Sequence, residues 1–165
     1  MSTYTAVHVA LSVVGIGSGF IVVFGLLTAN RLDTWTVIFL TTTVLTSVTG
    51  FGFPFHQLLP SHVVGALSLL VLAVAIFARY GRRFTGVWRR IYVVGVVVAL
   101  YFNVFVFVVQ AFLKVPALRA VAPTQSEPPF VLAQLMVLVG FLAIGVTGVI
   151  RFGKSAALAR PVGAR

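Results

Sequence analysis

The sequence predicts an all-α membrane protein: a compact bundle of five transmembrane helices, with the N-terminus outside and the C-terminus in the cytoplasm. Hydrophobic residues make up 60% of the 165 residues and charged residues only 8%, whereas about a quarter of a soluble domain is charged. Five apolar stretches approach the length of about 20 residues that a helix needs to cross a bilayer. The basic residues lie mainly between these stretches. We therefore expect one transmembrane domain over residues 1–150 and a basic cytoplasmic tail over 151–165.

The first two predicted spans cover residues 6–27 and 34–53. The segment before the first span lacks the lysines and arginines of a signal peptide, so we expect this span to stay in the membrane. Asp33 comes immediately before the second span and can cap its helix, because a carboxylate stabilises the positive end of the helix dipole. The threonines of the second span are expected to bond their own helix backbone.

The other three predicted spans cover residues 62–78, 91–113 and 130–150. Pro60 and Ser61 can start the third helix, with Ser61 as its cap. The fourth span is rich in valine, but it is too long for a membrane strand, which needs about 10 residues in an alternating pattern. A loop is expected between the fourth and fifth spans.

The positions of arginine and lysine predict the orientation. The gap over residues 79–90 holds five arginines and no acid, and the C-terminal tail is also basic. Basic loops stay in the cytoplasm, which places the N-terminus, the corner after the second span and the 114–129 loop outside. The net charge of +10 is then expected to face anionic lipid headgroups at the cytoplasmic surface, and nucleic acid is not an expected partner.

Small residues form narrow faces on two of the spans. Gly15 and Gly19 are spaced as a GxxxG pair in the first span, and Gly140, Gly145 and Gly148 give the fifth span a comparable face. Such faces let helix backbones approach closely. We expect them to serve packing inside the bundle. A dimer seam is the alternative, so a homo-oligomer or a larger membrane complex stays open.

All three histidines fall near the outer ends of predicted spans. His8 lies about one turn into the first span, because each residue advances a helix by about 1.5 Å. His56 follows the second span and His62 begins the third. Polar side chains within spans usually face the bundle interior and often mark function. The same half of the bundle is expected to hold four amide side chains: Gln57, Asn103, Gln110 and Gln134.

Two kinds of metal chemistry can use these histidines. Haem b takes two neutral imidazoles from different helices, and His8 with His62 meets that requirement. A transition metal such as zinc or copper can instead bind His8, His56 and His62 together, with Met136 as a soft copper ligand.

Two further interpretations need no metal. A quinone or another small apolar molecule can be held by one imidazole and an amide such as Gln57 or Gln134. Alternatively, His56 and His62 are hydrated residues at the membrane interface and bind nothing.

Two segments of the chain resemble known proteins. LTTTVLTSVTGFGFPFHQLLPSHVVG and VPALRAVAPTQSEPPF resemble segments of small multi-pass bacterial inner-membrane proteins that have no established activity, and this resemblance extends over residues 34–148. The TGF turn followed by histidine, with an HxxG helix start at His62, is distantly similar to bis-histidine b-type cytochromes of bacterial membranes. Those cytochromes often carry histidines at both membrane faces. In this chain the three histidines are predicted at one face, so the resemblance implies at most one haem.

The sequence favours a role without catalysis. Asp33 and Glu127 are the only acids and fall on opposite sides of the predicted topology, so they cannot form a carboxylate pair for acid–base chemistry. The chain has no cysteine, which excludes thiolate chemistry. We expect a multi-pass inner-membrane protein that acts as a non-catalytic subunit or assembly partner. The alternative is an electron-transfer module that holds haem, quinone or metal in the outer half of the bundle.

Overall fold

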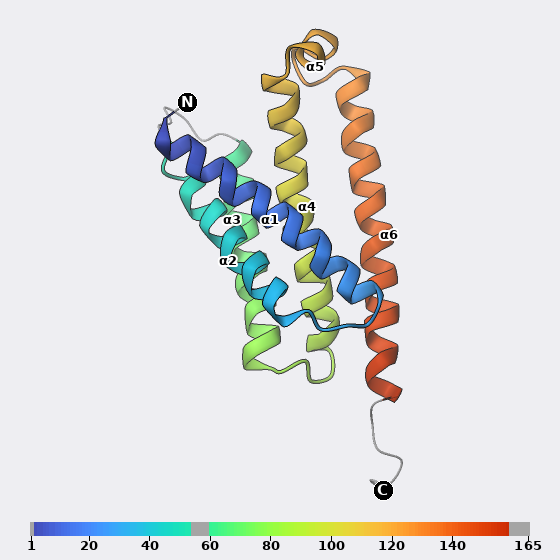
Figure 1. Ribbon diagram of the computed structural model, residues 1–165. Coiled ribbons are helices and arrows are strands. Elements are labelled where there is room, and N and C mark those ends of the chain that lie inside the picture. Colours follow the sequence, from blue (N-terminus) through green and yellow to red (C-terminus); the bar gives the residue numbers. More distant parts are fainter. Residues whose placement is uncertain (1, 54–59, 159–165) are drawn as a thin grey trace, which may run out of the picture.

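The computed structural model describes residues 2–53 and 60–158, and the regular structure within these ranges is helical. The elements, shown in Figure 1, are α1 (Thr3–Leu27), α2 (Asp33–Gly50), α3 (Pro60–Ile76), the π-helical turn η1 (Phe77–Gly81), α4 (Trp88–Lys114), α5 (Pro116–Val121) and α6 (Pro128–Leu158). The predicted all-α fold class is confirmed.

Four helices within the described ranges are long and apolar enough to cross a membrane: Thr3–Leu27, His62–Gly81, Trp88–Lys114 and Pro128–Phe152. They correspond to the first, third, fourth and fifth predicted spans, and they are the helices of a membrane protein. The second predicted span is helical as α2, but α2 has only 18 residues and many threonines, and it does not belong to this group of four.

Three helix ends differ from the sequence-based expectation. Leu32 occupies the N-cap position of α2 and Asp33 is the first helical residue, so Asp33 does not cap this helix. Helix α3 already begins at Pro60, which places Ser61 inside the helix. Helix α6 continues to Leu158, so the first part of the predicted tail is helical.

The connection between α4 and α6 contains the short helix α5, which the sequence analysis expected to be a loop. Pro116 is its first residue, a position that suits proline because its fixed φ matches the helix and its missing N–H is not needed there.

Between α5 and α6, the Glu127 carboxylate accepts hydrogen bonds from the backbone N–H groups of Thr124 and Ser126, both at 3.1 Å. Slight desolvation raises the pKa of Glu127, but these bonds and one from the Thr124 hydroxyl outweigh it, so the pKa lies below its ordinary value.

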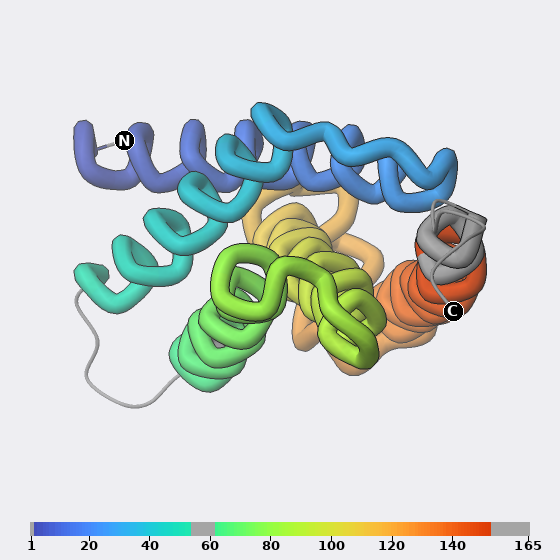
Figure 2. The backbone as a smooth tube through the Cα atoms, turned by 90° about the horizontal axis from the view of Figure 1, so that it is seen from below, coloured from blue at the N-terminus to red at the C-terminus, as the bar shows by residue number. Residues whose placement is uncertain are grey.

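The helices form an up-and-down bundle in which one pair crosses the others obliquely. Figure 1 shows α4 and α6 running side by side in opposite directions, with α5 joining their upper ends. Helices α1 and α2 form an antiparallel pair that leans across them. In Figure 2, α3, α4 and α6 are seen nearly end-on, whereas α1 lies across the view. The N-terminal end of α1 and α5 lie at one end of the bundle, and η1 and the last residues of α6 lie at the other (Figure 1).

Helices α1, α2 and α4 approach one another closely where α1 and α2 cross α4. Phe39 of α2 and Leu100 of α4 are both fully buried there. A methyl group added at Gly19 of α1 would lie 2.6 Å from Leu100 Cδ1 and 2.9 Å from Phe39 Cδ2. One added at Gly15 would lie 3.3 Å from the hydroxyl oxygens of Thr42 and Thr43. The predicted role of Gly15 and Gly19 in packing inside the bundle is confirmed.

The three predicted small-face glycines of α6 differ in whether they contact α4. A methyl group at Gly148 would lie 3.1 Å from Val93 of α4, and one at Gly145 would lie 3.6 Å from Val97. One added at Gly140 would meet nothing within 4 Å. Two of these glycines therefore let α6 approach α4, and Gly140 does not take part in that contact.

The threonines of α2 follow the expected bonding to their own helix only in part, and the buried Thr46 Oγ1 has no hydrogen-bond partner among the described residues. The hydroxyl groups of Thr36, Thr42 and Thr49 donate to the carbonyl oxygens four residues earlier, at 2.7 to 2.9 Å. Thr43 differs because its hydroxyl oxygen accepts a hydrogen bond from Asn103 Nδ2 of α4 at 3.2 Å. This bond ties α2 to α4 just beyond the crossing point.

The basic end of the bundle is held by Arg79, which is only 8% exposed. Its guanidinium forms an ion pair with Asp33 and donates a hydrogen bond to the Tyr92 hydroxyl at 3.1 Å. It thereby connects η1 with the start of α2 and the start of α4. Nearby, Arg31 lies 4.9 Å from the centre of the Phe84 ring, a distance at which a cation is attracted to an aromatic face.

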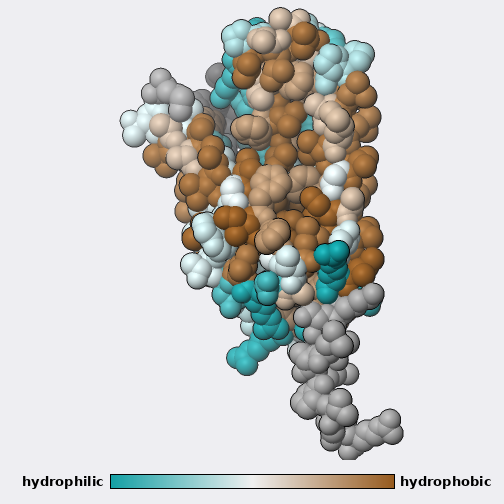
Figure 3. Space-filling model, turned by 45° about the vertical axis from the view of Figure 1, so that its right-hand side comes forward, coloured by the Kyte–Doolittle hydropathy of each residue, from teal (hydrophilic) through white to brown (hydrophobic). Residues whose placement is uncertain are grey.

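The outer surface matches a lipid environment. Figure 3 shows hydrophobic side chains over most of the visible face, with hydrophilic side chains gathered toward its ends. Helix α6 is the most exposed: Met136 is 70% exposed, Val139 63% and Val146 61%. In water such a surface would associate non-specifically, whereas in a bilayer it faces acyl chains.

Packing at Gly19 can be tested with a matched pair of variants. Gly19→Val is expected to destabilise the bundle by about 1–3 kcal/mol, because the added atoms overlap Leu100 and Phe39. Gly17→Val is the control, since a Cβ at Gly17 meets nothing within 4 Å. Thermal unfolding in detergent should show a lower melting temperature for Gly19→Val only. Equal melting temperatures for the two variants would contradict the assigned crossing point.

Candidate functional site

A cavity of about 540 Å³ lies between α1, α2, α3 and α4, in the half of the bundle that contains the N-terminus. The cavity arises because α1 and α2 cross α4 obliquely. Helices α1 and α4 touch at Gly19 and diverge toward the N-terminal end of α1 (Figures 1 and 2). The side chains between the diverging helices do not fill the space, and the cavity is partly open at its edge.

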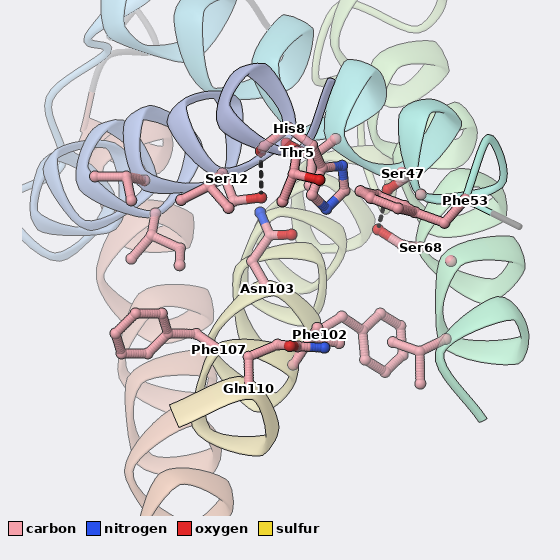
Figure 4. A pocket seen from close by; sticks show the side chains of 18 of the residues that line it. Thr5, His8, Ser12, Ser47, Phe53, Ser68, Phe102, Asn103, Phe107 and Gln110 are labelled. Atoms are coloured by element: carbon pink, nitrogen blue, oxygen red, sulfur yellow. Dashed lines mark hydrogen bonds between the residues drawn. The ribbon is translucent and has the colours of Figure 1, made fainter. Parts of the chain in front are cut away.

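The walls of the cavity are mainly apolar, with a few polar side chains. Phe102 and Phe107 of α4 and Ile16 of α1 contribute hydrocarbon surface. Polar groups come from both sides: Thr5, His8 and Ser12 lie on α1, and Asn103, Gln110 and Lys114 lie on α4. Figure 4 shows these two sets of labelled polar side chains, except Lys114, on opposite sides of the same space. Among the described residues that line the cavity, none is acidic.

His8 is held in a defined orientation by α2. Its Nδ1 lies 2.8 Å from the Thr49 hydroxyl oxygen, and its ring meets the Phe53 ring edge-on with 5.0 Å between the ring centres. The Thr49 hydroxyl oxygen also lies 2.7 Å from the Leu45 carbonyl oxygen. The Thr49 hydroxyl can donate either to this carbonyl oxygen or to His8 Nδ1, so the direction of the bond to His8 depends on the tautomer of the ring. When the hydroxyl hydrogen is on Leu45, Nδ1 donates and Nε2 of the neutral ring carries the lone pair.

His62 reaches the same cavity from α3. It is 7% exposed and lies beside the Phe51 ring, with 5.8 Å between the ring centres. This burial argues against the interpretation of His62 as a hydrated interfacial residue. Close by, the Ser47 and Ser68 hydroxyl groups are hydrogen-bonded at 3.3 Å and join α2 to α3 (Figure 4). Two of the three predicted histidines therefore line one cavity.

The predicted site residues His56 and Gln57 lie outside the described residues. Within residues 2–53 and 60–158, no group of three or more His, Cys, Asp or Glu side chains is placed to hold a metal ion. The predicted three-histidine metal site depends on His56 and stays a prediction. Met136, the predicted soft copper ligand, is exposed on α6 and does not line the cavity.

The structure does not bring Gln134 to the histidines. Its side chain lies between α6 and α4, where Nε2 donates to the Phe105 carbonyl oxygen at 3.2 Å. Its Oε1 is buried and has no hydrogen-bond partner among the described residues. Gln134 therefore joins two helices, and the amides that line the cavity are Asn103 and Gln110.

The sequence pointed to His8 and to the amides of α4, whereas Thr5 and Ser12 of α1 were missed. Thr5 and Ser12 flank His8 at spacings of three and four residues, which places all three on one helix face. Asn103, Gln110 and Lys114 share a face of α4 in the same way. A search for polar residues at helical spacing within each apolar span would have found both sets.

No protein-family model, curated protein or solved structure matches the chain.

Proposed function

We propose that the chain is an integral protein of a bacterial inner membrane that binds a small, largely apolar molecule in this cavity. The observation that carries the proposal is the cavity itself. Its volume of about 540 Å³ lies within the roughly 300–1,000 Å³ of ligand pockets, which combine apolar walls with a few placed polar groups. The ligand would be about the size of one ring with a short apolar chain, and a quinone head group belongs to this class.

The arrangement of the helices supports α2 as a fifth membrane span, and it supports an orientation of the bundle with its basic end in the cytoplasm. Helices α1 and α3 both run from the N-terminal end of the bundle toward the basic end, and α2 returns between them (Figure 1). If α1 and α3 both cross the membrane, α2 has to cross it as well. The arginines of residues 79–90 lie at the end opposite α5, and basic ends stay in the cytoplasm, next to anionic lipid. The cavity is then in the outer half of the membrane.

Topology reporters test this orientation. A reporter fused after Gly86 should indicate the cytoplasm, and one fused after Thr124 should indicate the periplasm, because α4 separates these positions. Measuring both reporters in the same strain background gives the comparison. Reporting from the same compartment would contradict the proposed orientation.

Haem b is a larger alternative occupant of the same cavity. It needs two axial imidazoles, and His8 and His62 both line the cavity. Part of the space next to each imidazole is already filled, by Phe53 beside His8 and by Phe51 beside His62. Haem therefore requires more rearrangement than a ring-sized ligand does.

Absorbance spectroscopy separates these two occupants. The small-ligand proposal predicts no Soret band for the protein purified from cells supplied with haem precursors. A Soret band that is present in the unmodified protein and lost in His62→Ala would assign the site to haem instead.

A role as a non-catalytic subunit or assembly partner is a second candidate, favoured by α6. Few residues of the α6 span are buried in the single chain, and its apolar face is wide enough to meet either lipid or another membrane subunit. Native electrophoresis of gently solubilised membranes tests this role. A complex larger than the chain in its detergent micelle supports it, and migration as a monomer argues against it.

Binding to the cavity can be measured in lipid nanodiscs with radiolabelled para-pentylphenol as the probe. Partition into lipid is linear in probe concentration, whereas a cavity should add a saturable component of one molecule per chain. Val106→Trp is expected to remove the saturable component, because Val106 lines the cavity and the indole would fill it. Val94→Trp is the matched control on the same helix, since Val94 is 48% exposed on the outer surface.

Two results would contradict the proposal. One is the absence of saturable uptake by the unmodified protein relative to empty nanodiscs. The other is saturable uptake that persists unchanged in Val106→Trp while the circular dichroism spectrum shows that this variant is folded.

A further inference from the structure

The hydrogen bonds of Thr49 are linked to the tautomer of His8. The Thr49 hydroxyl has one hydrogen, which can be donated to the Leu45 carbonyl oxygen at 2.7 Å. In that arrangement the 2.8 Å bond between Thr49 and His8 Nδ1 uses the N–H of the imidazole. The second nitrogen, Nε2, is then an acceptor for which no hydrogen-bond partner is found among the described residues.

The position of His8 makes this acceptor available to the cavity. The residue lines the cavity from α1 (Figure 4), and its bond to Thr49 holds the ring against α2. Other groups that line the cavity can also accept hydrogen bonds, namely the amide oxygens of Asn103 and Gln110 and the hydroxyl oxygen of Thr46. Lys114 only donates hydrogen bonds, and the Asn103 Nδ2 group is already bonded to Thr43. The Ser12 hydroxyl donates to the carbonyl oxygen of His8 at 2.9 Å.

We propose that the cavity selects ligands that carry a hydroxyl group, of the phenol or quinol class, by accepting the O–H hydrogen bond at His8 Nε2. This inference rests on the proposed function and specifies its ligand class. A quinone or an ether of the same size offers only acceptors, so Nε2 gains no bond from it and is left buried without a partner, which carries a free-energy cost. The amide of Gln110, for which no hydrogen bond is found among the described residues, and the ammonium of Lys114 both line the cavity and can donate to an acceptor group elsewhere on the same ligand.

The test compares para-pentylphenol with para-pentylanisole, its methyl ether, in the nanodisc assay at about pH 8, where imidazoles are ordinarily neutral. The two ligands differ only in the hydroxyl hydrogen and a methyl group. The phenol is expected to bind about tenfold more tightly than the ether, the effect of one well-formed hydrogen bond. His8→Phe keeps a ring at this position but has no acceptor, so it should reduce the preference to about twofold or less.

Variants of Thr49 test the tautomer separately from the histidine. Thr49→Val removes the acceptor that fixes the proton on Nδ1, and it should lower the phenol preference. Thr49→Ser keeps the hydroxyl group and should preserve the preference. Thr42→Val is the matched control, because the Thr42 hydroxyl bonds its own helix at Ile38 and Thr42 does not line the cavity.

The outcomes distinguish this inference from the proposed function. Equal saturable binding of the phenol and the ether would overturn the hydroxyl selectivity and leave the binding cavity intact. A phenol preference that survives in folded His8→Phe would overturn the role of His8. Absence of saturable binding for both ligands would overturn the proposed function, and this inference with it.

Discussion

The close approach of α1 to α2 and α4 at Gly15 and Gly19 is the constraint on which the rest of the structure depends. Without a side chain at Gly19, Phe39 and Leu100 from two other helices reach the backbone of α1. Three helices can then meet at one point while crossing obliquely. On the basic side of this point the bundle is closed by Arg79, Asp33 and Tyr92. On the other side α1 leans away from α4, and the cavity occupies the space between them.

Polar groups in the cavity serve two purposes: some join helices, and others face the cavity with unused hydrogen-bonding capacity. Some join helices, as in the bonds from Asn103 to Thr43 and from Ser47 to Ser68. These bonds are expected in an apolar bundle, because an unpaired polar group in hydrocarbon is costly. Others keep an unused hydrogen-bonding group at the cavity surface, as His8 Nε2 and Gln110 do in the described part of the chain. This second set gives the cavity its chemical character, an imidazole on α1 facing an amide and an ammonium group on α4.

The positions of four apolar helices and of two histidines could be predicted from sequence because both are local properties. A run of apolar residues gives the length of a helix, and His8 and His62 each lie near the same end of their own helices. The cavity could not be predicted, because it depends on contacts between residues distant in the sequence, such as Gly19 with Leu100. Similarly, the position of Asp33 suggested a helix cap, whereas its partner is Arg79 of η1. The placement of Gln134 between α4 and α6 also depends on how the helices pack.

The central claim is that an apolar ring-sized molecule occupies the space between α1 and α4. Photo-crosslinking in nanodiscs with para-pentylphenyl azide, followed by peptide mapping, tests it most directly. The account predicts adducts concentrated on cavity-lining residues of α1 and α4, such as Val9 and Val106, which disappear with excess para-pentylphenol. Adducts spread over the exposed face of α6, and unaffected by that competitor, would contradict it.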